Sequence, residues 1–236
     1  MYVYIYDEFI NKGRHDKALY KVEKRLTDLG LNGKTIRLGT TKNLKSAIDD
    51  EIRQGAKTIV AVGNDQTVAQ VINVIANNQS DEKYRLCLGI IPLEEKENHL
   101  AKIMGIKNLN DACEVLLGRR LETFKLAAIN NDFFLFNAKT ETNNTIIEID
   151  KSFIIQPTKT AYLEINNSPK LENPKKLLTL KIKEGDAESS FSFQEMLLVN
   201  KDVPIITDEA LPVKTPVKIF LSDETIKIIV GKDRKI

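Results

Sequence analysis

The stretch Thr58–Val71, TIVAVGNDQTVAQV, decides the fold class because its hydrophobic period changes at a single glycine. The first five residues, Thr58–Val62, are β-branched or small, which is typical of a buried strand. Beyond Gly63 the turn is polar, and apolar residues recur at helical spacing from Thr67 to Ala76. A buried strand that leads through a short turn into a helix is the repeating unit of a parallel α/β sheet.

Strand-like and helix-like patterns alternate on both sides of this stretch. The expected strands are Tyr2–Tyr6, Lys34–Leu38 and Leu86–Ile91, and the expected helices are Asp16–Leu29, Leu44–Arg53, Leu100–Met104 and Leu109–Leu117, the last ending at Gly118. This alternation predicts an α/β domain over residues 1–120, with a parallel sheet that carries helices on both faces.

Beyond Gly118 the pattern changes to short segments rich in Ile, Phe, Leu and Thr, separated by polar turns. The expected strands are Lys125–Ile129, Phe133–Phe136, Thr145–Ile149, Ala161–Ile165, Leu177–Ile182, Ser190–Phe193, Met196–Val199, Val217–Leu221 and Ile226–Val230. They predict a β-sandwich domain over residues 121–225, with the boundary where the period changes, near residues 119–124.

The composition is that of a globular protein, and a location in the cytoplasm is expected. Lys and Arg total 35 against 33 Asp and Glu, and they are dispersed along the chain, so no footprint for nucleic acid is expected. The longest apolar runs, such as Ile59–Val62 and Phe133–Phe136, are far shorter than the roughly 20 residues of a membrane span. Met1–Tyr6 runs straight into Asp7 and Glu8, so it is expected to be a first strand rather than a signal peptide.

Several chemistries have no basis in the sequence. Cys87 and Cys113 lack the spacing of a disulfide scaffold or a zinc site and are expected to be buried apolar residues in a reducing compartment. His15 and His99 are the only histidines, and neither has a ligand or nucleophile partner at motif spacing. No Walker loop, G-x-G-x-x-G or G-x-S-x-G motif is present.

Two loops follow strands of the predicted parallel sheet, where ligands bind in open α/β sheets. They are Gly63–Thr67 and Pro92–Asn98. Amides of the first loop and the start of its helix could hold phosphate. Alternatively, Asp65 or Thr67 only caps the helix.

These loops resemble the motifs of the diacylglycerol kinase catalytic family, which is related in fold to the NAD kinases. Gly63–Val71 stands where that family has G-G-D-G-T-x-N-E-V, and Pro92–Ile106 stands where it has P-L-G-T-G-N-D-F-A-R-x-L-G-I, with one extra residue. Gly118-Arg119 and Asn131–Asn137 also resemble the family, so the likeness extends over about the first 135 residues. It implies a β-sandwich after the first domain and a C-terminal segment, 226–236, that returns to it.

The resemblance implies ATP-dependent phosphorylation of a lipid hydroxyl, with Mg²⁺ and a lipid substrate at the membrane surface. The positions matching the family's nucleotide-binding residues are Thr40 or Thr41, Gly63, Asn64, Asp65, Gln66, Thr67 and Asn98. No metal ligands are assigned, and the oligomeric state stays open.

The family's catalytic glutamate lies in a D-G-E motif, for which the sequence allows two registers. Aligning that motif with Thr207-Asp208-Glu209 makes Glu209 the general base. A register anchored on Lys214-Thr215-Pro216 instead puts Asp208 at the motif's Asp and Ala210 at the glutamate. A third interpretation treats both acidic residues as solvated turn residues.

The loops also depart from the family's pattern. Asn64 and Gln66 replace two glycines that let phosphate approach the backbone, and Glu94 and Glu95 replace a Gly and the ATP-contacting Thr. At ~4 Å each added charge repels a phosphate by about 1 kcal/mol in water and about 4 kcal/mol at an intermediate dielectric. Two hypotheses follow: an active lipid kinase, or a catalytically inactive member that uses the interdomain cleft for another ligand or a partner protein.

Overall fold

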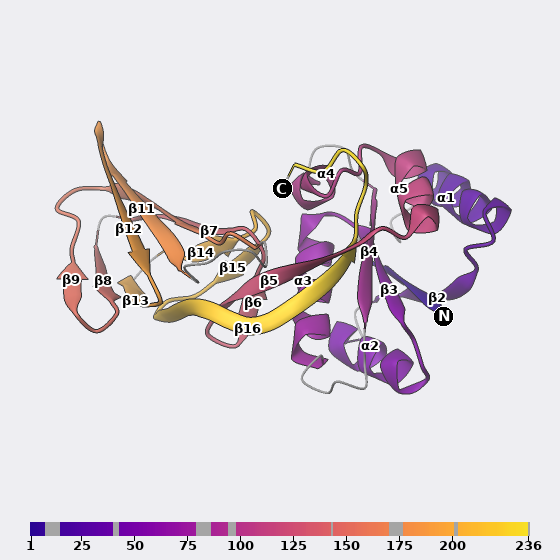
Figure 1. The fold of residues 1–236 in the computed structure, drawn as a ribbon, viewed down its shortest axis with the longest axis horizontal. Helices are drawn as coiled ribbons and strands as arrows, with labels where there is room; N and C mark the ends of the chain where they lie inside the picture. The colour runs from indigo at the N-terminus through magenta and orange to yellow at the C-terminus, as the bar shows by residue number, and fades with distance from the viewer. Residues whose placement is uncertain are drawn as a thin grey trace. The chain divides into compact units, whose positions relative to one another are not determined.

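The computed structural model describes residues 1–7, 15–39, 43–78, 86–93, 98–142, 144–169, 177–200 and 203–235. The chain divides into two compact units, Met1–Thr123 together with Ile226–Ile236, and Phe124–Thr225. Figure 1 shows the helices gathered in the first unit, while the second is built from strands.

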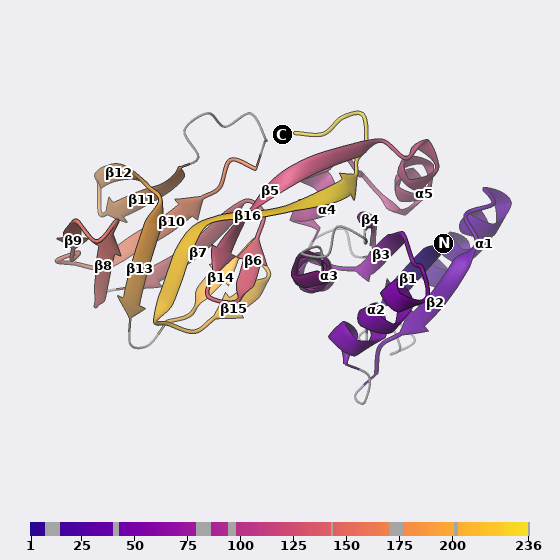
Figure 2. The ribbon, with the colours of Figure 1, turned by 60° about the horizontal axis from the view of Figure 1, so that its bottom comes forward.

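The first unit is a parallel sheet with helices on both faces. Its strands are β1 (Tyr2–Tyr6), β2 (Gly33–Arg37), β3 (Thr58–Gly63) and β4 (Cys87–Pro92), in the order β2-β1-β3-β4. Its helices are α1 (Asp16–Asp28), α2 (Leu44–Arg53), α3 (Asp65–Asn78), α4 (His99–Ile103) and α5 (Leu109–Gly118). In Figure 2, α1 and α5 lie together on one face, and α2 and α3 lie together on the other.

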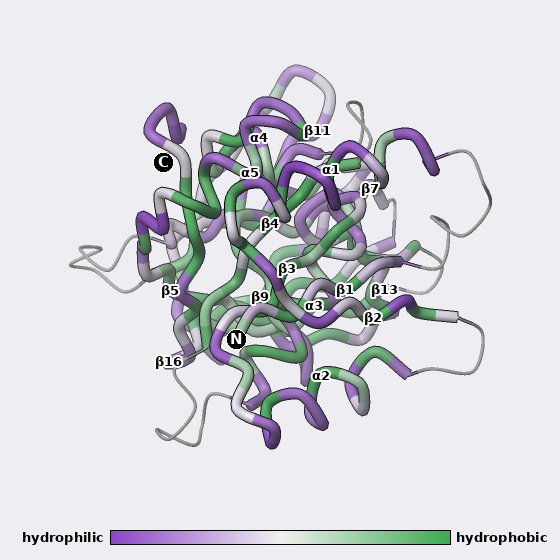
Figure 3. The backbone as a smooth tube through the Cα atoms, turned by 90° about the vertical axis from the view of Figure 1, so that its right-hand side faces the viewer, coloured by the Kyte–Doolittle hydropathy of each residue, from purple (hydrophilic) through white to green (hydrophobic). Residues whose placement is uncertain are grey.

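The register of the sheet brings the carboxyl ends of three strands to one edge. Tyr6 pairs with Val62, and Val62 pairs with Ile91. The residues that follow β1, β3 and β4 therefore meet at this carboxyl edge. All six residues of β3 and of β4 are buried, and the hydrophobic course of both strands can be followed in Figure 3.

The second unit is a sandwich of two mainly antiparallel sheets. One contains β5 (Leu121–Ile129), β6 (Asp132–Phe134), β8 (Thr145–Ile149), β9 (Phe153–Ile155), β13 (Glu195–Asn200) and β16 (Val217–Ile229). The other has the order β12-β11-β10-β7-β14-β15, with bounds Ala187–Phe193, Leu178–Glu184, Ala161–Asn166, Asn137–Thr142, Ile205–Thr207 and Leu211–Val213. The predicted fold class, an α/β domain followed by a β-sandwich, is confirmed.

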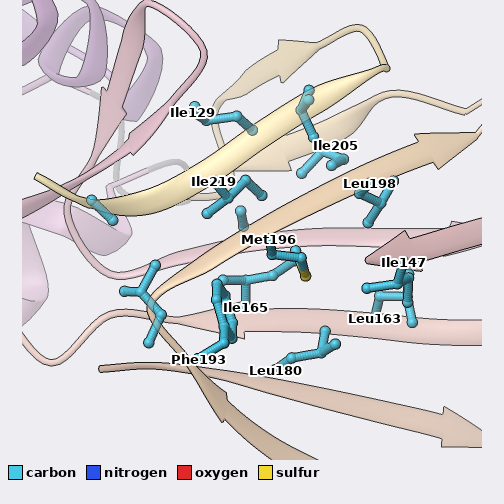
Figure 4. Close-up of a cluster of buried hydrophobic side chains, with 14 of the residues drawn as sticks. Ile129, Ile147, Leu163, Ile165, Leu180, Phe193, Met196, Leu198, Ile205 and Ile219 are labelled. Atoms are coloured by element: carbon cyan, nitrogen blue, oxygen red, sulfur yellow. The ribbon is translucent and has the colours of Figure 1, made fainter. Parts of the chain in front are cut away.

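The core of the sandwich is made of inward-facing side chains from both sheets. Figure 4 shows Ile147, Met196 and Leu198 of one sheet facing Leu163 and Leu180 of the other. These side chains have no exposed surface. Alternate residues of a strand point to opposite faces, so each strand contributes every second side chain to this layer.

The C-terminal strands differ from the sequence prediction. Val217–Leu221 and Ile226–Val230 were expected to be separate, but β16 is one strand of 13 residues. Val217 and Ile219 are buried at its start, whereas Ser222, Ile226 and Ile228 are buried later, so the buried parity changes within the strand. The sequence pattern suggested a break because the strand serves the sandwich core first and the first unit's sheet afterwards.

Four short strands were not predicted, namely β7, β9, β14 and β15. In β7 the buried positions are Ala138, Thr140 and Thr142, so two of its three core side chains carry a hydroxyl and conceal the alternation. The helix that was expected to end at Gly118 does so, because α5 spans Leu109–Gly118. The left-handed residue that follows it is Arg119, with φ 45°.

Both cysteines are buried, as predicted. Burial raises the pKa of the Cys87 and Cys113 thiols, which makes them poor nucleophiles. Within the described residues, none of the helices combines the length and the apolar character that a membrane crossing needs.

The last part of β16 completes the first unit's sheet by pairing with β4, and this pairing can be tested. Lys227 and Ile228 pair with Cys87 and Leu88, and Ile228 is fully buried. We expect Ile228→Ala to lower the free energy of unfolding by about 2–5 kcal/mol because it leaves a cavity. Lys227→Ala, one residue away on the opposite face, should change it by less than about 0.5 kcal/mol in the same denaturant titration. Equal effects would contradict this account.

Candidate functional site

Asp65 is the residue that organises the carboxyl edge of the first unit. It opens α3 and is only 5% exposed. Its Oδ2 accepts the backbone N–H of His99 at 2.6 Å, and its Oδ1 accepts that of Leu100 at 2.9 Å. The carboxylate thus caps the first turn of α4, where free amides and the helix dipole favour a negative charge.

Thr67 and Asn64 form a second set of bonds at the start of α3. Asn64 Oδ1 accepts the backbone N–H of Thr67 at 3.1 Å, so it caps the helix from the position that the family gives to glycine. The fully buried Thr67 hydroxyl donates to Asp7 Oδ2 at 2.5 Å. A side chain at position 63 would collide with Thr67, which explains why Gly63 is needed at the end of β3.

Asn98 differs from these residues because its side-chain amide is not used internally. It is only 2% exposed, and neither Oδ1 nor Nδ2 has a hydrogen-bond partner among the described residues. It lines a pocket of about 140 Å³ together with Pro92, Leu93, Lys102, Ile106, Lys107, Asn108 and Leu109. A buried polar group without a partner costs about 1–3 kcal/mol, so a ligand or water in this pocket would stabilise it.

The other predicted nucleotide-binding positions contribute less to this geometry. Gln66 is exposed on the first turn of α3. Thr40 and Thr41 lie outside the described residues, as do Glu94 and Glu95. The structure therefore brings together Gly63, Asn64, Asp65, Thr67 and Asn98 from the predicted set.

Asp208 has a structural role in the second unit. It is buried, which corrects the interpretation of this residue as a solvated turn residue. Its carboxylate accepts the backbone N–H groups of Leu135, Phe136 and Asn137 at 2.6, 2.8 and 3.2 Å. Three such bonds hold the turn between β6 and β7, and Asp208 itself has a left-handed backbone conformation, with φ 48°.

Glu209, the predicted general base, is half-exposed and bound to a cation. Lys139 Nζ lies 3.0 Å from its Oε1 and 3.6 Å from Glu164 Oε1. Burial alone would lower the pKa of Lys139, but the hydrogen bond with Glu209 and the charges of both glutamates raise it. Lys139 therefore stays protonated and neutralises Glu209.

The residues present do not form an obvious metal site. Within the described ranges, no three or more His, Cys, Asp and Glu side chains are grouped as metal ligands would be. Asp65 is the retained carboxylate of the family's first motif, but both of its oxygens already accept backbone N–H groups and little of its surface is open. The described residues do not fit Mg²⁺ at this position.

Comparison with known proteins decides the family. The model of the diacylglycerol kinase catalytic domain matches residues 1–129, more than half of the chain. The chain belongs to this family. No curated protein sequence matches it.

Solved structures share the fold of this diacylglycerol kinase family member over nearly its whole length. A diacylglycerol kinase from Bacillus anthracis strain Sterne has a TM-score of 0.72 and 15% identity, covering 98% of this chain and 97% of that chain. Two further structures from the same strain have TM-scores of 0.70 and 0.71 at 14% identity, each covering at least 97% of both chains. Identity at this level shows the fold alone.

Sequence reasoning missed two functional candidates, Asp7 and Lys139. Asp7 directly follows β1, so the rule that singled out the loops after β3 and β4 could have found it. Lys139 lies in β7, a strand that was not predicted, and its partner Glu209 is 70 residues further along the chain. No local signal connects these two residues.

The capping role of Asp65 predicts that its charge is needed for stability whether or not nucleotide binds. In Asp65→Asn one carboxylate oxygen becomes an NH₂ group that faces an N–H donor, so we expect a loss of about 1–3 kcal/mol in the free energy of unfolding. Gln66→Asn, at the exposed neighbouring position, is the control and should be neutral. Chemical denaturation of both variants measures the difference, and an Asp65→Asn variant as stable as the parent would refute the cap.

Proposed function

We propose that this family member binds a small polar ligand at the carboxyl edge of its first unit and does not phosphorylate lipid. The observation that carries the proposal is the engagement of Asp65, whose two oxygens accept the N–H groups of His99 and Leu100. An aspartate committed to holding a helix is a poor candidate for contacting nucleotide or Mg²⁺.

The charges at this edge also disfavour a polyphosphate. Asp7 lies within hydrogen-bond distance of Thr67, and Glu94 and Glu95 add two negative charges in the second loop. Each acidic group at ~4 Å from a phosphate would weaken binding by about 1–4 kcal/mol, depending on the local dielectric. Lys102 lines the same pocket as Asn98, and its positive charge suits a ligand that carries fewer negative charges than a polyphosphate.

The predicted base is poorly suited to proton abstraction. A general base needs a free carboxylate, whereas Glu209 is neutralised by Lys139 at 3.0 Å.

The pocket around Asn98 supports the choice of ligand. Its volume of about 140 Å³ suits a group the size of one phosphate or carboxylate and is too small for a whole nucleotide. Asn98 could donate from Nδ2 and accept at Oδ1, and Lys102 could balance one negative charge.

The second candidate is an active lipid kinase that uses ATP and Mg²⁺ and meets its lipid at the membrane surface. Family membership favours it. The side-chain amide of Asn98 also favours it, because this residue matches a nucleotide-binding position of the family and has no hydrogen-bond partner among the described residues.

Calorimetry and a transfer assay separate the two candidates. We expect no heat of binding for Mg-ATP at up to about 1 mM, measurable binding of inorganic phosphate, and no phosphate transfer from ATP to diacylglycerol in mixed micelles. Asn98→Ala should abolish the binding of phosphate. Asn108→Ala changes another residue that lines the same pocket and should weaken phosphate binding less. Micromolar binding of Mg-ATP with transfer to lipid would replace this proposal with the kinase.

Restoring the family's loop residues tests whether the loops have lost a nucleotide site. Gln66→Gly combined with Glu94→Gly and Glu95→Thr removes two carboxylates and gives phosphate access to the backbone, so ATP affinity should rise at least about tenfold. Glu188→Thr, on an exposed position of β12, removes an acidic residue elsewhere and should have no effect. Tight binding by the parent protein that the triple variant weakens would show adapted loops instead.

A further inference from the structure

A second pocket lies on the first unit, between α5 and the segment that follows β16. Its volume is about 540 Å³, which falls within the range of about 300–1,000 Å³ that small-molecule sites occupy. It shares no lining residue with the pocket that Asn98 lines. This α5 pocket is therefore a separate candidate site.

Backbone contacts fix the wall that the C-terminal segment contributes to the α5 pocket. Figure 1 shows this segment running past α4. The N–H of Gly231 donates to the carbonyl of Met104 at 2.8 Å, and that of Val230 donates to the carbonyl of Arg120 at 2.8 Å. A side chain at position 231 would collide with the carbonyl oxygen of Gly105, so the two chain segments touch backbone to backbone. The pocket is thus formed without a ligand.

The carboxylates that line the α5 pocket already have donors. Lys107 Nζ lies 2.6 Å from Asp233 Oδ2, and the backbone N–H of Lys107 donates to Asp111 Oδ2 at 2.8 Å. Glu114 forms an ion pair with Arg25. The hydrogen bond with Asp233, and also the charge of Asp111, raise the pKa of Lys107, so this lysine stays protonated between two acids. None of the three carboxylates therefore needs a cationic ligand.

Two cations at the α5 pocket are less engaged. The side chains of Arg120 and Lys232 make no hydrogen bond and no ion pair with any residue in the described part of the chain. The charge of Lys232 lowers the pKa of Asp233, but the hydrogen bond with Lys107 is the larger cause. A guanidinium presents planar N–H donors that match a carboxylate, sulfonate or phosphate. The charge that this pocket can still bind is therefore negative.

The α5 pocket also offers apolar surface. Val115, Leu117 and Val230 line it, and Leu117 is 48% exposed. Gly118 lines it too, and a Cβ at this position would meet no atom within 4 Å, so open space lies beside the apolar side chains. An anion with a hydrophobic body would remove Leu117 from water, whereas inorganic phosphate would leave it exposed.

We propose that the α5 pocket binds a small organic anion that carries an apolar body, of the class of the aryl carboxylates. Arg120 and Lys232 bind the carboxylate. Val115, Leu117 and Val230 contact the apolar body. The walls come from α5 and from the segment after β16, so the ligand joins the end of the chain to the rest of the first unit. Its binding therefore stabilises the folded first unit by mass action.

Calorimetry with 2-naphthoate and 2-naphthamide tests the charge requirement on the full chain. The two probes share one apolar body, and only 2-naphthoate is an anion. We expect 2-naphthoate to bind with a Kd below about 1 mM and the amide to bind at least about tenfold more weakly. Arg120→Gln should weaken 2-naphthoate binding at least about tenfold, and Lys232→Gln at least about threefold. Lys181→Gln removes a cation from an exposed position of β11 and should leave binding unchanged.

Filling the pocket tests where the anion binds. Gly118→Phe adds a ring beside the apolar wall and should raise the Kd of 2-naphthoate at least about tenfold, whereas Gly118→Ala leaves room and should change it less than about twofold. Circular dichroism verifies that each variant is folded, and saturating 2-naphthoate should raise the melting temperature of the parent.

Four results would overturn the proposal. The first is a parent that shows no binding of 2-naphthoate at about 1 mM, and the second is equal affinity for the acid and the amide. The third is a Lys181→Gln variant that binds as weakly as Arg120→Gln, since a general charge effect would then explain the loss. The fourth is binding that survives Gly118→Phe, because the anion would then lie outside the α5 pocket.

Discussion

The pairing between the end of β16 and β4 is the constraint on which the rest of the structure depends. It adds the last strand of the chain to the parallel strands β1, β2, β3 and β4, which lie within the first 92 residues. The whole second unit lies in sequence between Thr123 and Ile226. Because contacts between distant residues require closing a long loop, the first unit cannot complete its core until the sandwich has been synthesised. The buried residues of β16 change from odd to even positions because the start of the strand packs in the sandwich core and its end packs in the core of the first unit.

The same sheet explains why motif residues can persist without a nucleotide. The parallel sheet brings the carboxyl ends of β1, β3 and β4 to one edge in register. The first turn of α3 therefore faces the first turn of α4. Asp65 joins these two turns, and Thr67 joins α3 to the end of β1 through Asp7. Both residues therefore stabilise the fold by bonds that need no ligand. The side chain of Asn98 makes no such bond with any described residue, which makes it the more informative residue about binding.

The sequence predicts those features that depend on neighbouring residues. The spans of α2 and β8 match the prediction to the residue, because apolar spacing alone defines them. β7 was missed because its core positions are partly threonine. The structural role of Asp208 could not be predicted from the sequence, for a different reason. Its three amide partners lie more than 70 residues away and meet it only in the folded sandwich, so neither register of the D-G-E motif could be chosen from local pattern.

The two sheets of the sandwich bury the same kind of residue but differ on their outer faces. In β11 the outward positions are Thr179, Lys181 and Lys183, the polar alternation of a strand that meets water. In β13 the corresponding positions include Leu197 and Val199. Both strands have the same inward pattern, so core packing does not account for the difference. Apolar side chains scattered over an outer face are ordinary, but here Leu197 and Val199 adjoin Ile146 and Glu148 on the neighbouring strand, and Glu148 has no ion-pair partner among the described residues. The outer positions of β13 therefore carry more apolar surface than those of β11.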